Sequence, residues 1–323
     1  EICISGDEPL EILDSTQLAQ VDPETLKALA GKANVYARVS PAHKLQIVQA
    51  LQSAGKTVAM TGDGINDGPA LKAADLGIAM GQSGTDVARD VADIILQTDN
   101  LEALTLALGD GRAIYTNIRK SVHFFITTNI SEILLMFAAM GFNIGFPLNV
   151  MQLLWINIIS DIFPGLALSM EAPEPGIMKK PPRDPQAPLY SKKDYLRMLA
   201  ESSAITAGAL SAYGFGIMRY AKGPQAASLA FQSLTIGQLL HAISCRSETE
   251  SVYSGGKIPS NPYLKWALGG SIALQVLTIV FPPLRRLLGI TRLSPADIAV
   301  ICGTSIAPLL LNEATKKTKQ EKP

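Results

Sequence analysis

Hydrophobic and polar residues alternate on two different length scales along this chain. From residue 34 to about residue 116, short apolar runs alternate with longer amphipathic segments, and polar turns separate them. From about residue 121 onward, the apolar runs reach about 20 residues, which is the length that crosses a bilayer as a helix. The pattern predicts a soluble module at residues 1–118, a membrane module at 119–313 and a basic tail at 314–323.

The soluble module is predicted to be an α/β domain in which helices cover a parallel sheet, because strands and helices alternate along it. The predicted strands are 34–39, 58–60, 76–80 and 93–96. The predicted helices are 41–54, 68–74, 86–91 and 100–116. Functional groups in such sheets gather at the carboxyl ends of strands, so the residues after the first two strands are candidates for a site.

The membrane module is predicted to be an all-α bundle of six membrane-spanning helices. The six apolar stretches are 121–140, 148–170, 196–218, 226–245, 263–282 and 295–312. Lysines and arginines gather before the first span, between the second and third spans and in the tail, whereas the loop 141–147 has no charge. The positive-inside rule therefore places the soluble module and the C-terminus in the cytoplasm of a multi-pass membrane protein.

Overall composition excludes some partners. The chain has 28 basic and 28 acidic residues, so its net charge gives no reason to expect a nucleic-acid partner. Cys3, Cys245 and Cys302 show no paired spacing, and they fit neither a disulfide scaffold nor a CxxC metal site. His241 is expected to be a packed core histidine rather than a metal ligand.

The stretch 60–72 carries the strongest chemical signal, and it reads Met-Thr-Gly-Asp-Gly-Ile-Asn-Asp-Gly-Pro-Ala-Leu-Lys. Glycines in a turn let the backbone approach a ligand closely, and aspartates after a strand are suited to hold Mg²⁺ beside a phosphate. The alternative without a functional role is an ordinary Asx-rich turn. The candidates are Thr61, Gly62 and Gly64 for cofactor approach, and Asp63, Asn66 and Asp67 for chemistry.

Lys44 is a second candidate in the soluble module, because it follows the strand 34–39. A lysine and a carboxylate at one sheet edge would serve a phosphoryl group, with Lys44 offsetting its charge and Asp63 holding Mg²⁺. Taken alone, Lys44 reads as a solvated helix residue.

Ionisable residues interrupt the first two membrane spans, where each costs about 2.5–3.5 kcal/mol at the bilayer centre. The candidate ligands of a cation are Asn129 and Glu132 in the first span, and Asn157, Ser160 and Asp161 in the second. Their oxygen atoms suit a hard cation such as Ca²⁺. Pro164 frees a helix carbonyl that would add to the ligands. The alternative is interhelical hydrogen bonding or snorkelling towards an interface.

The stretch 60–72 resembles the hinge motif of P-type cation-transporting ATPases, and 38–44 (Arg-Val-Ser-Pro-Ala-His-Lys) is similar to their Arg-x-x-Pro-x-x-Lys element. The resemblance implies the C-terminal half of a phosphorylation domain with a haloacid-dehalogenase-like fold. It also implies that Lys44 contacts the phosphate, that Asp63 binds Mg²⁺, and that Asn66 and Asp67 support a phosphoaspartate and its hydrolysis. Gly68 departs from the alanine usual in that family.

The first two spans resemble the fifth and sixth membrane helices of the calcium-pump-like P2 subgroup, which carry Asn-x-x-Glu and Asn-x-x-Ser/Thr-Asp ligand patterns. The run 152–157 (Gln-Leu-Leu-Trp-Ile-Asn) is closest to calcium and manganese pumps, so Ca²⁺ or Mn²⁺ is the favoured transported cation, with Mg²⁺ and Na⁺ left open. Gln238 stands where two-site calcium pumps carry a ligand glutamate. It is a further candidate ligand, and the number of ion sites stays open.

The resemblance implies the C-terminal part of an ATP-driven pump. The family's phosphorylated aspartate lies in Asp-Lys-Thr-Gly-Thr, which this chain lacks, so the nucleophile and most of the ATP site are expected in a missing N-terminal part. This chain alone is then expected to be inactive. The alternative is a catalytically inert truncated or split membrane protein that associates with another pump or regulates it. A membrane-anchored phosphatase is disfavoured by the absent nucleophile motif.

Overall fold

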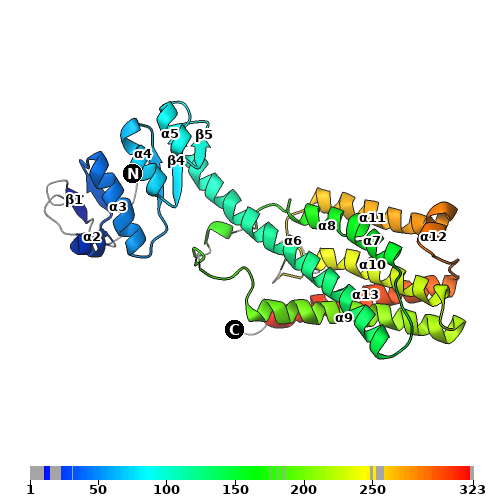
Figure 1. Ribbon diagram of the computed structural model, residues 1–323. Coiled ribbons are helices and arrows are strands. Elements are labelled where there is room, and N and C mark those ends of the chain that lie inside the picture. Colours follow the sequence, from blue (N-terminus) through cyan, green and yellow to red (C-terminus); the bar gives the residue numbers. More distant parts are fainter. Residues whose placement is uncertain are drawn as a thin grey trace. The chain divides into compact units, whose positions relative to one another are not determined.

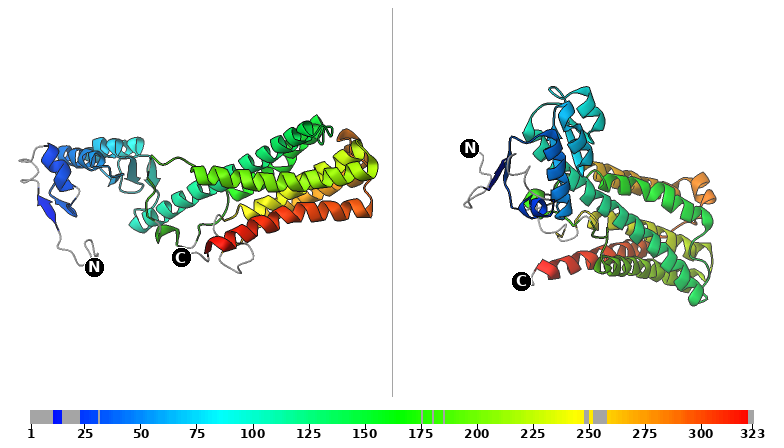
Figure 2. Two further views of the ribbon diagram at one scale, coloured as in Figure 1. Left: turned by 90° about the horizontal axis from the view of Figure 1, so that it is seen from below. Right: turned by 60° about the vertical axis from the view of Figure 1, so that its left-hand side comes forward.

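The computed structural model describes residues 11–14, 23–30, 32–174, 176–179, 181–184, 186–247, 250–251 and 258–320. The chain divides into two compact units, Glu1–Leu108 and Gly109–Pro323. The division falls ten residues before the boundary predicted from the sequence. Figures 1 and 2 show the elements of each unit.

The first unit contains short strands and short helices in alternation. Its described strands are β1 (Ile12–Asp14), β2 (Val35–Ala37), β3 (Ala59–Gly62), β4 (Leu76–Met80) and β5 (Ile94–Leu96). Its described helices are α2 (Pro23–Ala30), α3 (Pro41–Ser53), the 3₁₀ turn η1 (Ile65–Asp67), α4 (Gly68–Ala73) and α5 (Asp86–Val91). Alternation of this kind, with parallel strands, confirms the α/β class that the sequence predicted.

The described strands form two parallel sheets, whereas the sequence predicted a single sheet. The strand β2 pairs with β1, and β3, β4 and β5 form the other sheet in that order. Arg38 directly follows β2 and has a φ of 54°, so the backbone leaves the extended conformation there. The strands before Lys44 and Asp63 therefore do not share a sheet edge, and a helix has to bring Lys44 to the loop after β3.

The helix α3 does this. Ser40 accepts a hydrogen bond from the backbone N–H of His43 (3.3 Å), and Pro41 occupies the first turn, so the helix begins where both residues favour a start. One face of α3 buries Ile47 in a small core against α2. The amide of Gln52 donates to the carbonyl oxygen of Ala73 at the end of α4 (2.9 Å). These contacts fix α3 against α2 and against α4, the helix that follows the loop after β3.

The second unit is helical. After α6 (Leu101–Gly141), which starts in the first unit, it contains α7 (Val150–Trp155), the π turn η2 (Ile156–Ser160), α8 (Ile162–Leu168), the 3₁₀ turn η3 (Ile177–Lys179), α9 (Lys192–Tyr220), α10 (Pro224–Ser244), α11 (Pro262–Val280), α12 (Pro282–Leu287) and α13 (Pro295–Gln320). The sequence predicted a helix at 100–116 and a separate span at 121–140. The structure joins them in α6, because no proline interrupts residues 101–141.

The helix α10 lies in the middle of the second unit, and it packs against α9, α11 and α13 (Figures 1 and 2). Phe231 and Leu234 of α10 are fully buried in the main core, together with Leu135 of α6, Ile156 of the π turn and Ile205 of α9. This core includes residues of α6, the π turn and α10, which carry the candidate cation ligands, so packing helps to fix the positions of those ligands.

Four helices among the described residues are long and apolar enough to cross a membrane: Glu102–Gly141, Val150–Leu168, Pro262–Val280 and Pro295–Lys316. All six predicted spans coincide with helices, but α9 and α10 are less apolar than the other four. The first turns of α9 are charged, and α10 carries buried polar side chains such as Gln232, which donates to the Thr278 hydroxyl of α11 (2.9 Å). Hydropathy alone counts such internally satisfied groups as if they faced lipid.

The C-terminal residues differ from the solvated tail that the sequence suggested. The helix α13 continues past residue 314 to Gln320, and Lys316 within it is buried. Its ammonium group donates to the carbonyl oxygen of Ser244 (2.6 Å) and to the carboxylate of Glu313 (2.7 Å). These contacts fasten α13 to the end of α10.

Candidate functional site

The loop after β3 is held in shape by the side chain of Asp67. This residue is only 5% exposed, and its Oδ2 accepts a hydrogen bond from the backbone N–H of Gly64 (3.3 Å). A Cβ added to Gly62 would lie 2.6 Å from the Cβ of Asp67, so only glycine fits there. Glycine at this position therefore lets Asp67 fold back over the loop.

Lys44 reaches this loop from α3. Its ammonium nitrogen lies 2.5 Å from Oδ1 of Asp67, and the Lys44 side chain keeps 33% of its surface exposed. Burial raises the pKa of Asp67, but the hydrogen bond from Lys44 and the backbone N–H of Gly64 lower it more, so the net pKa lies below the usual value. Asp67 is thus held as a carboxylate, and Lys44 as a positioned cation at the surface.

The other predicted residues of this loop have different surroundings. Asp63 and Asn66 are exposed, and Thr61 is half-buried. The backbone carbonyl of Asp63 accepts a hydrogen bond from the N–H of Thr85 (2.8 Å), which fixes the backbone at the carboxyl end of β3. The Asp63 carboxylate is therefore exposed on a fixed backbone. Thr85 was not predicted, and its only sequence signal is the Gly-Thr-Asp turn before α5.

An exposed carboxylate on the same loop as the Lys44–Asp67 ion pair fits a Mg²⁺ and phosphate site. Mg²⁺ in phosphate-handling proteins is usually held by one or two carboxylates together with phosphate oxygens and water. Asp63 offers such a carboxylate, whereas both oxygens of Asp67 already accept hydrogen bonds. The two aspartates of this loop therefore have different surroundings. Asp67 pairs with Lys44 and positions it, whereas the exposed carboxylate of Asp63 is accessible to a cation.

The second candidate site lies between α6, the π turn and α10. Glu132 of α6 is 6% exposed. Its Oε2 accepts from the amide of Asn157 (3.2 Å), and its Oε1 accepts from the amide of Gln238 (3.3 Å). Asp161 is 2% exposed, and its carboxylate lies close enough to Glu132 for their charges to interact. Three helical segments thus bring four of the predicted residues together.

Several oxygen atoms in this cluster have no hydrogen-bond partner within the described part of the chain. They are both carboxylate oxygens of Asp161 and the amide oxygen of Gln238. The hydroxyl of Thr128, which lies beside Asp161, donates instead to the carbonyl oxygen of Phe125 (3.1 Å). Unpaired buried carboxylates are costly, and a bound cation would satisfy them. The ligand atoms are all oxygens, which fits a hard cation.

The local backbone brings Asp161 into this position. The N–H of Asp161 donates to the carbonyl oxygen of Ile156 (3.0 Å), five residues earlier, as in a π turn, and such turns recur at functional sites. Pro164 has no N–H, so the carbonyl of Ser160 lacks its helical donor. A Cβ at Gly165 would lie 2.1 Å from the ring of Phe125 in α6. The glycine therefore lets α8 and α6 approach closely.

The remaining predicted ligands are placed less centrally. Asn129 is exposed, and its amide donates to the carbonyl oxygen of Phe125 in its own helix (2.7 Å). Ser160 is 1% exposed and lies next to Asp161. Ser131 was not predicted, although its hydroxyl contacts the amide of Gln238 (3.2 Å). Its place in the polar run Thr-Asn-Ile-Ser-Glu is the sequence signal that could have identified Ser131.

Comparison with known proteins identifies two regions. Residues 145–318 match the family model "Cation transporting ATPase, C-terminus", and residues 5–75 match "haloacid dehalogenase-like hydrolase". The second match agrees with the α/β fold of the first unit.

Three curated relatives illustrate the similarity. A "Calcium-transporting ATPase" of Bacillus subtilis (strain 168) is 37% identical, and the alignment covers 96% of this chain and 35% of that protein. The "Calcium-transporting ATPase type 2C member 1" of Homo sapiens is also 37% identical, with 99% and 34% covered. The "Calcium-transporting ATPase 1" of Schizosaccharomyces pombe is 35% identical, with 96% and 34% covered.

This chain spans about a third of the length of these relatives. The family model covers more than half of the chain, and it spans the π turn, Asp161 and Gln238. The chain belongs to the cation-transporting ATPase family.

Proposed function

We propose that this chain is the C-terminal part of an ATP-driven cation pump that transports Ca²⁺ or Mn²⁺. The observation that carries the proposal is the buried cluster of Glu132, Asp161 and Gln238, in which both carboxylate oxygens of Asp161 and the amide oxygen of Gln238 lack a hydrogen-bond partner among the described residues. Its two carboxylates match the two charges of a divalent cation. Relatives named as calcium-transporting ATPases support the same assignment.

The cation ligands proposed in this chain are Asn129, Glu132, Asn157, Ser160, Asp161 and Gln238. Glu132 and Asp161 supply the charge, and the buried Ser160 supplies a carbonyl that Pro164 leaves free. Asn157 and Gln238 donate amide hydrogens to Glu132. When the cation binds, the amide oxygen of Gln238 would turn to it, and Glu132 would exchange amide donors for the ion.

The loop after β3 is proposed to serve phosphoryl transfer. Lys44 would offset the charge of the phosphoryl group, Asp67 would hold Lys44 in place, and Asp63 would hold Mg²⁺, with Asn66 beside them. Mg²⁺, when bound, would neutralise phosphoryl oxygens. Thr61, Gly62 and Gly64 would keep the backbone close to the phosphate. ATP would be bound mainly by parts of the pump outside this chain, and the first unit and the C-terminus would lie in the cytoplasm.

Equilibrium binding of radioactive Ca²⁺ and of Mn²⁺ to the purified chain in detergent tests the membrane site. We expect both ions to bind and Glu132→Gln to weaken binding at least tenfold. Glu313→Gln is the matched control, because Glu313 is equally buried but is paired with Lys316. Equal binding by the wild-type chain and Glu132→Gln would contradict the ligand assignment and favour an inert or regulatory membrane protein.

A second experiment addresses the phosphoryl site. Incubation of the chain with radiolabelled ATP and Mg²⁺ should leave no acid-stable label, because residues 1–323 contain no Asp-Lys-Thr-Gly-Thr string. Acid-stable label would mean that another aspartate of the chain is the nucleophile, and the roles given to Asp63 and Asp67 would have to be reassigned.

A further inference from the structure

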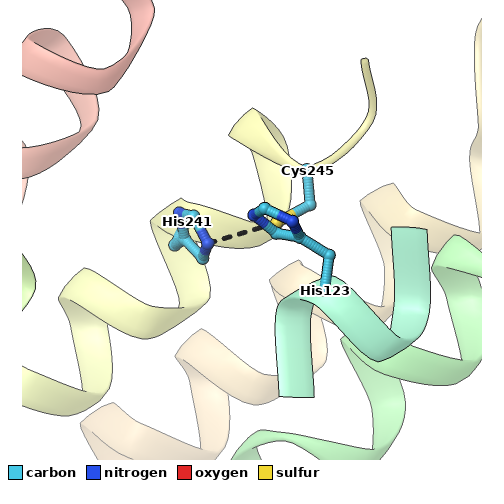
Figure 3. Close-up of side chains that lie close together, drawn as sticks. All are labelled: His123, His241 and Cys245. Carbon is cyan, nitrogen blue, oxygen red and sulfur yellow. Dashed lines mark hydrogen bonds between the residues drawn. The ribbon is translucent and has the colours of Figure 1, made fainter. Parts of the chain in front are cut away.

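Three side chains with nitrogen and sulfur ligand atoms meet in the interior of the second unit, apart from the oxygen cluster. His123 comes from α6, and His241 and Cys245 come from the last turn of α10 and its C-cap (Figure 3). Their exposed fractions are 7%, 2% and 6%, and one ligand atom from each lies within 4.8 Å of the other two. The sulfur of Cys245 lies 3.2 Å from Nε2 of His241. Metal–ligand distances of about 2.0–2.3 Å place neighbouring ligand atoms of a tetrahedral site about 3.3–3.8 Å apart, so the sulfur of Cys245 and Nε2 of His241 lie near that separation.

A carboxylate completes the set. Glu201 of α9 is buried, and its Oε2 lies 2.5 Å from Nε2 of His123 and 3.7 Å from Nε2 of His241. Its other oxygen accepts from Nε of Arg197 (2.7 Å), which fixes the carboxylate in place. Carboxylates beside metal-binding histidines either ligate the metal or orient the imidazole rings. Glu201 is positioned for either role.

Protein groups alone leave His241 poorly satisfied. Its Nδ1 has no hydrogen-bond partner in the described residues, and its Nε2 has the Cys245 sulfur as its nearest polar contact. A thiol is a weak donor and a weak acceptor, so this contact offsets little of the cost of burying an imidazole. The fully buried ring of Phe124 stacks against the His241 ring. A metal ion would convert this strained set of polar groups into ligands.

The chemistry of the donors selects the kind of ion. Imidazole nitrogens and a thiolate prefer borderline transition metals such as Zn²⁺, whereas Ca²⁺ and Mg²⁺ prefer oxygen ligands. A Cys245 thiolate and the Glu201 carboxylate together carry two negative charges, which equals the charge of Zn²⁺. The site is therefore chemically distinct from the cluster around Glu132 and Asp161.

We propose that His123, His241 and Cys245, with Glu201 as fourth ligand or orienting group, form a binding site for Zn²⁺ or a similar borderline transition metal. This inference does not rest on the proposed function. The bound ion would join α6 to α10, and these two helices also contact each other through Glu132 and Gln238. Metal binding would thus clamp the two helices one to three turns from the oxygen cluster.

Binding of Co²⁺ and Zn²⁺ to the purified chain in detergent tests the proposal, with Ca²⁺ present to occupy oxygen sites. Co²⁺ should give a near-ultraviolet thiolate-to-metal band at one equivalent per chain, and Zn²⁺ should bleach that band by displacement. Cys245→Ser should remove the band, and Glu201→Gln should weaken affinity about 10–100-fold. The controls are Cys302→Ser, which changes an exposed thiol, and Cys3→Ser; both should keep the band.

X-ray absorption at the zinc edge on the wild-type chain keeps the test independent of any variant. We expect one sulfur at about 2.3 Å and two or three nitrogen or oxygen atoms at about 2.0–2.1 Å. A zinc shell of oxygen and nitrogen without sulfur would overturn the proposal. So would a Co²⁺ band that survives Cys245→Ser, and so would the absence of any thiolate band in the wild-type chain.

Discussion

Asp161 and Asp297 are two buried aspartates with opposite surroundings, and replacing each by asparagine should have opposite effects. Asp161 is 2% exposed with both carboxylate oxygens unpaired among the described residues. Asp297 is 1% exposed, and its Oδ2 accepts from the N–H of Ser294 (2.7 Å) and from the hydroxyl of Tyr220 (2.9 Å). The same chemical change therefore removes an unpaired charge in one case and a paired charge in the other.

The magnitudes follow from these contacts. Burying a polar group without a partner costs about 1–3 kcal/mol, and more when it is charged, so Asp161→Asn should stabilise the cation-free chain by at least about 1 kcal/mol. A cation at one hundred times its Kd stabilises the wild-type chain by about 2.7 kcal/mol, and Asp161→Asn should lose that gain. Asp297→Asn weakens charge-assisted hydrogen bonds and should cost about 1.5–3 kcal/mol with and without the cation.

The assay is unfolding of the purified chain in mixed micelles, followed by tryptophan fluorescence in excess chelator or in saturating Ca²⁺. Trp155 and Trp266 both lie in the second unit, so the signal reports unfolding of the helices that carry the site. The reasoning is refuted if Asp161→Asn is less stable than the wild-type chain in chelator. It is equally refuted if that variant keeps the full stabilisation by Ca²⁺.

Three further predictions concern other contacts. Gly208→Ala should be about 1–3 kcal/mol less stable than the control Gly214→Ala. A Cβ at Gly208 would lie 2.4 Å from a backbone oxygen of α13, whereas a Cβ at Gly214 meets no described atom within 4 Å. Equal stability of the two variants in the micelle assay would contradict this packing. Lys44→Met should lower the protection of residues 59–80 from hydrogen exchange by about 1–2 kcal/mol at neutral pH. Because the pKa of Asp67 is lowered in the folded chain, this difference should persist above about pH 4 and shrink as the pH falls through that pKa, and a pH-independent difference would exclude the ion pair as its cause. Gln238→Glu should place a second carboxylate about 3.3 Å from that of Glu132, a repulsion of about 5 kcal/mol at an effective dielectric of 20. Ca²⁺ should therefore stabilise this variant more than the wild-type chain. Equal stabilisation of the two chains would remove residue 238 from the site.

Elements with strong local signals were predictable from the sequence. The strand 76–80 and the helix 86–91 have the predicted bounds, because Asp75 and Thr85 mark where each begins. Helix ends next to proline, as at Pro41, were also predictable. Local residue preferences decide these boundaries, and those preferences can be read from a single sequence.

Features that depend on distant partners were not predictable. The separation of β2 from β3 into two sheets depends on which strands pair, and the alternation of strands and helices does not specify that. The close approach of α8 to α6 at Gly165 depends on the Phe125 ring of another helix, which no local pattern around Gly165 specifies. His241 and Cys245, four residues apart, share a helix face, but His123 and Glu201 join them only through helix packing.

The π turn at residues 156–160 has a consequence for how such a site can evolve. An α-helix rotates by about 100° per residue, so one additional residue in a turn shifts the phase of everything that follows. A single-codon insertion between Asn157 and Asp161 would rotate Asp161, Pro164 and Gly165 as a block relative to Asn157, while all four of these side chains are kept. Ion preference in a site built this way can therefore be altered by changing the length of one turn, a route that comparisons of ligand identities alone would miss.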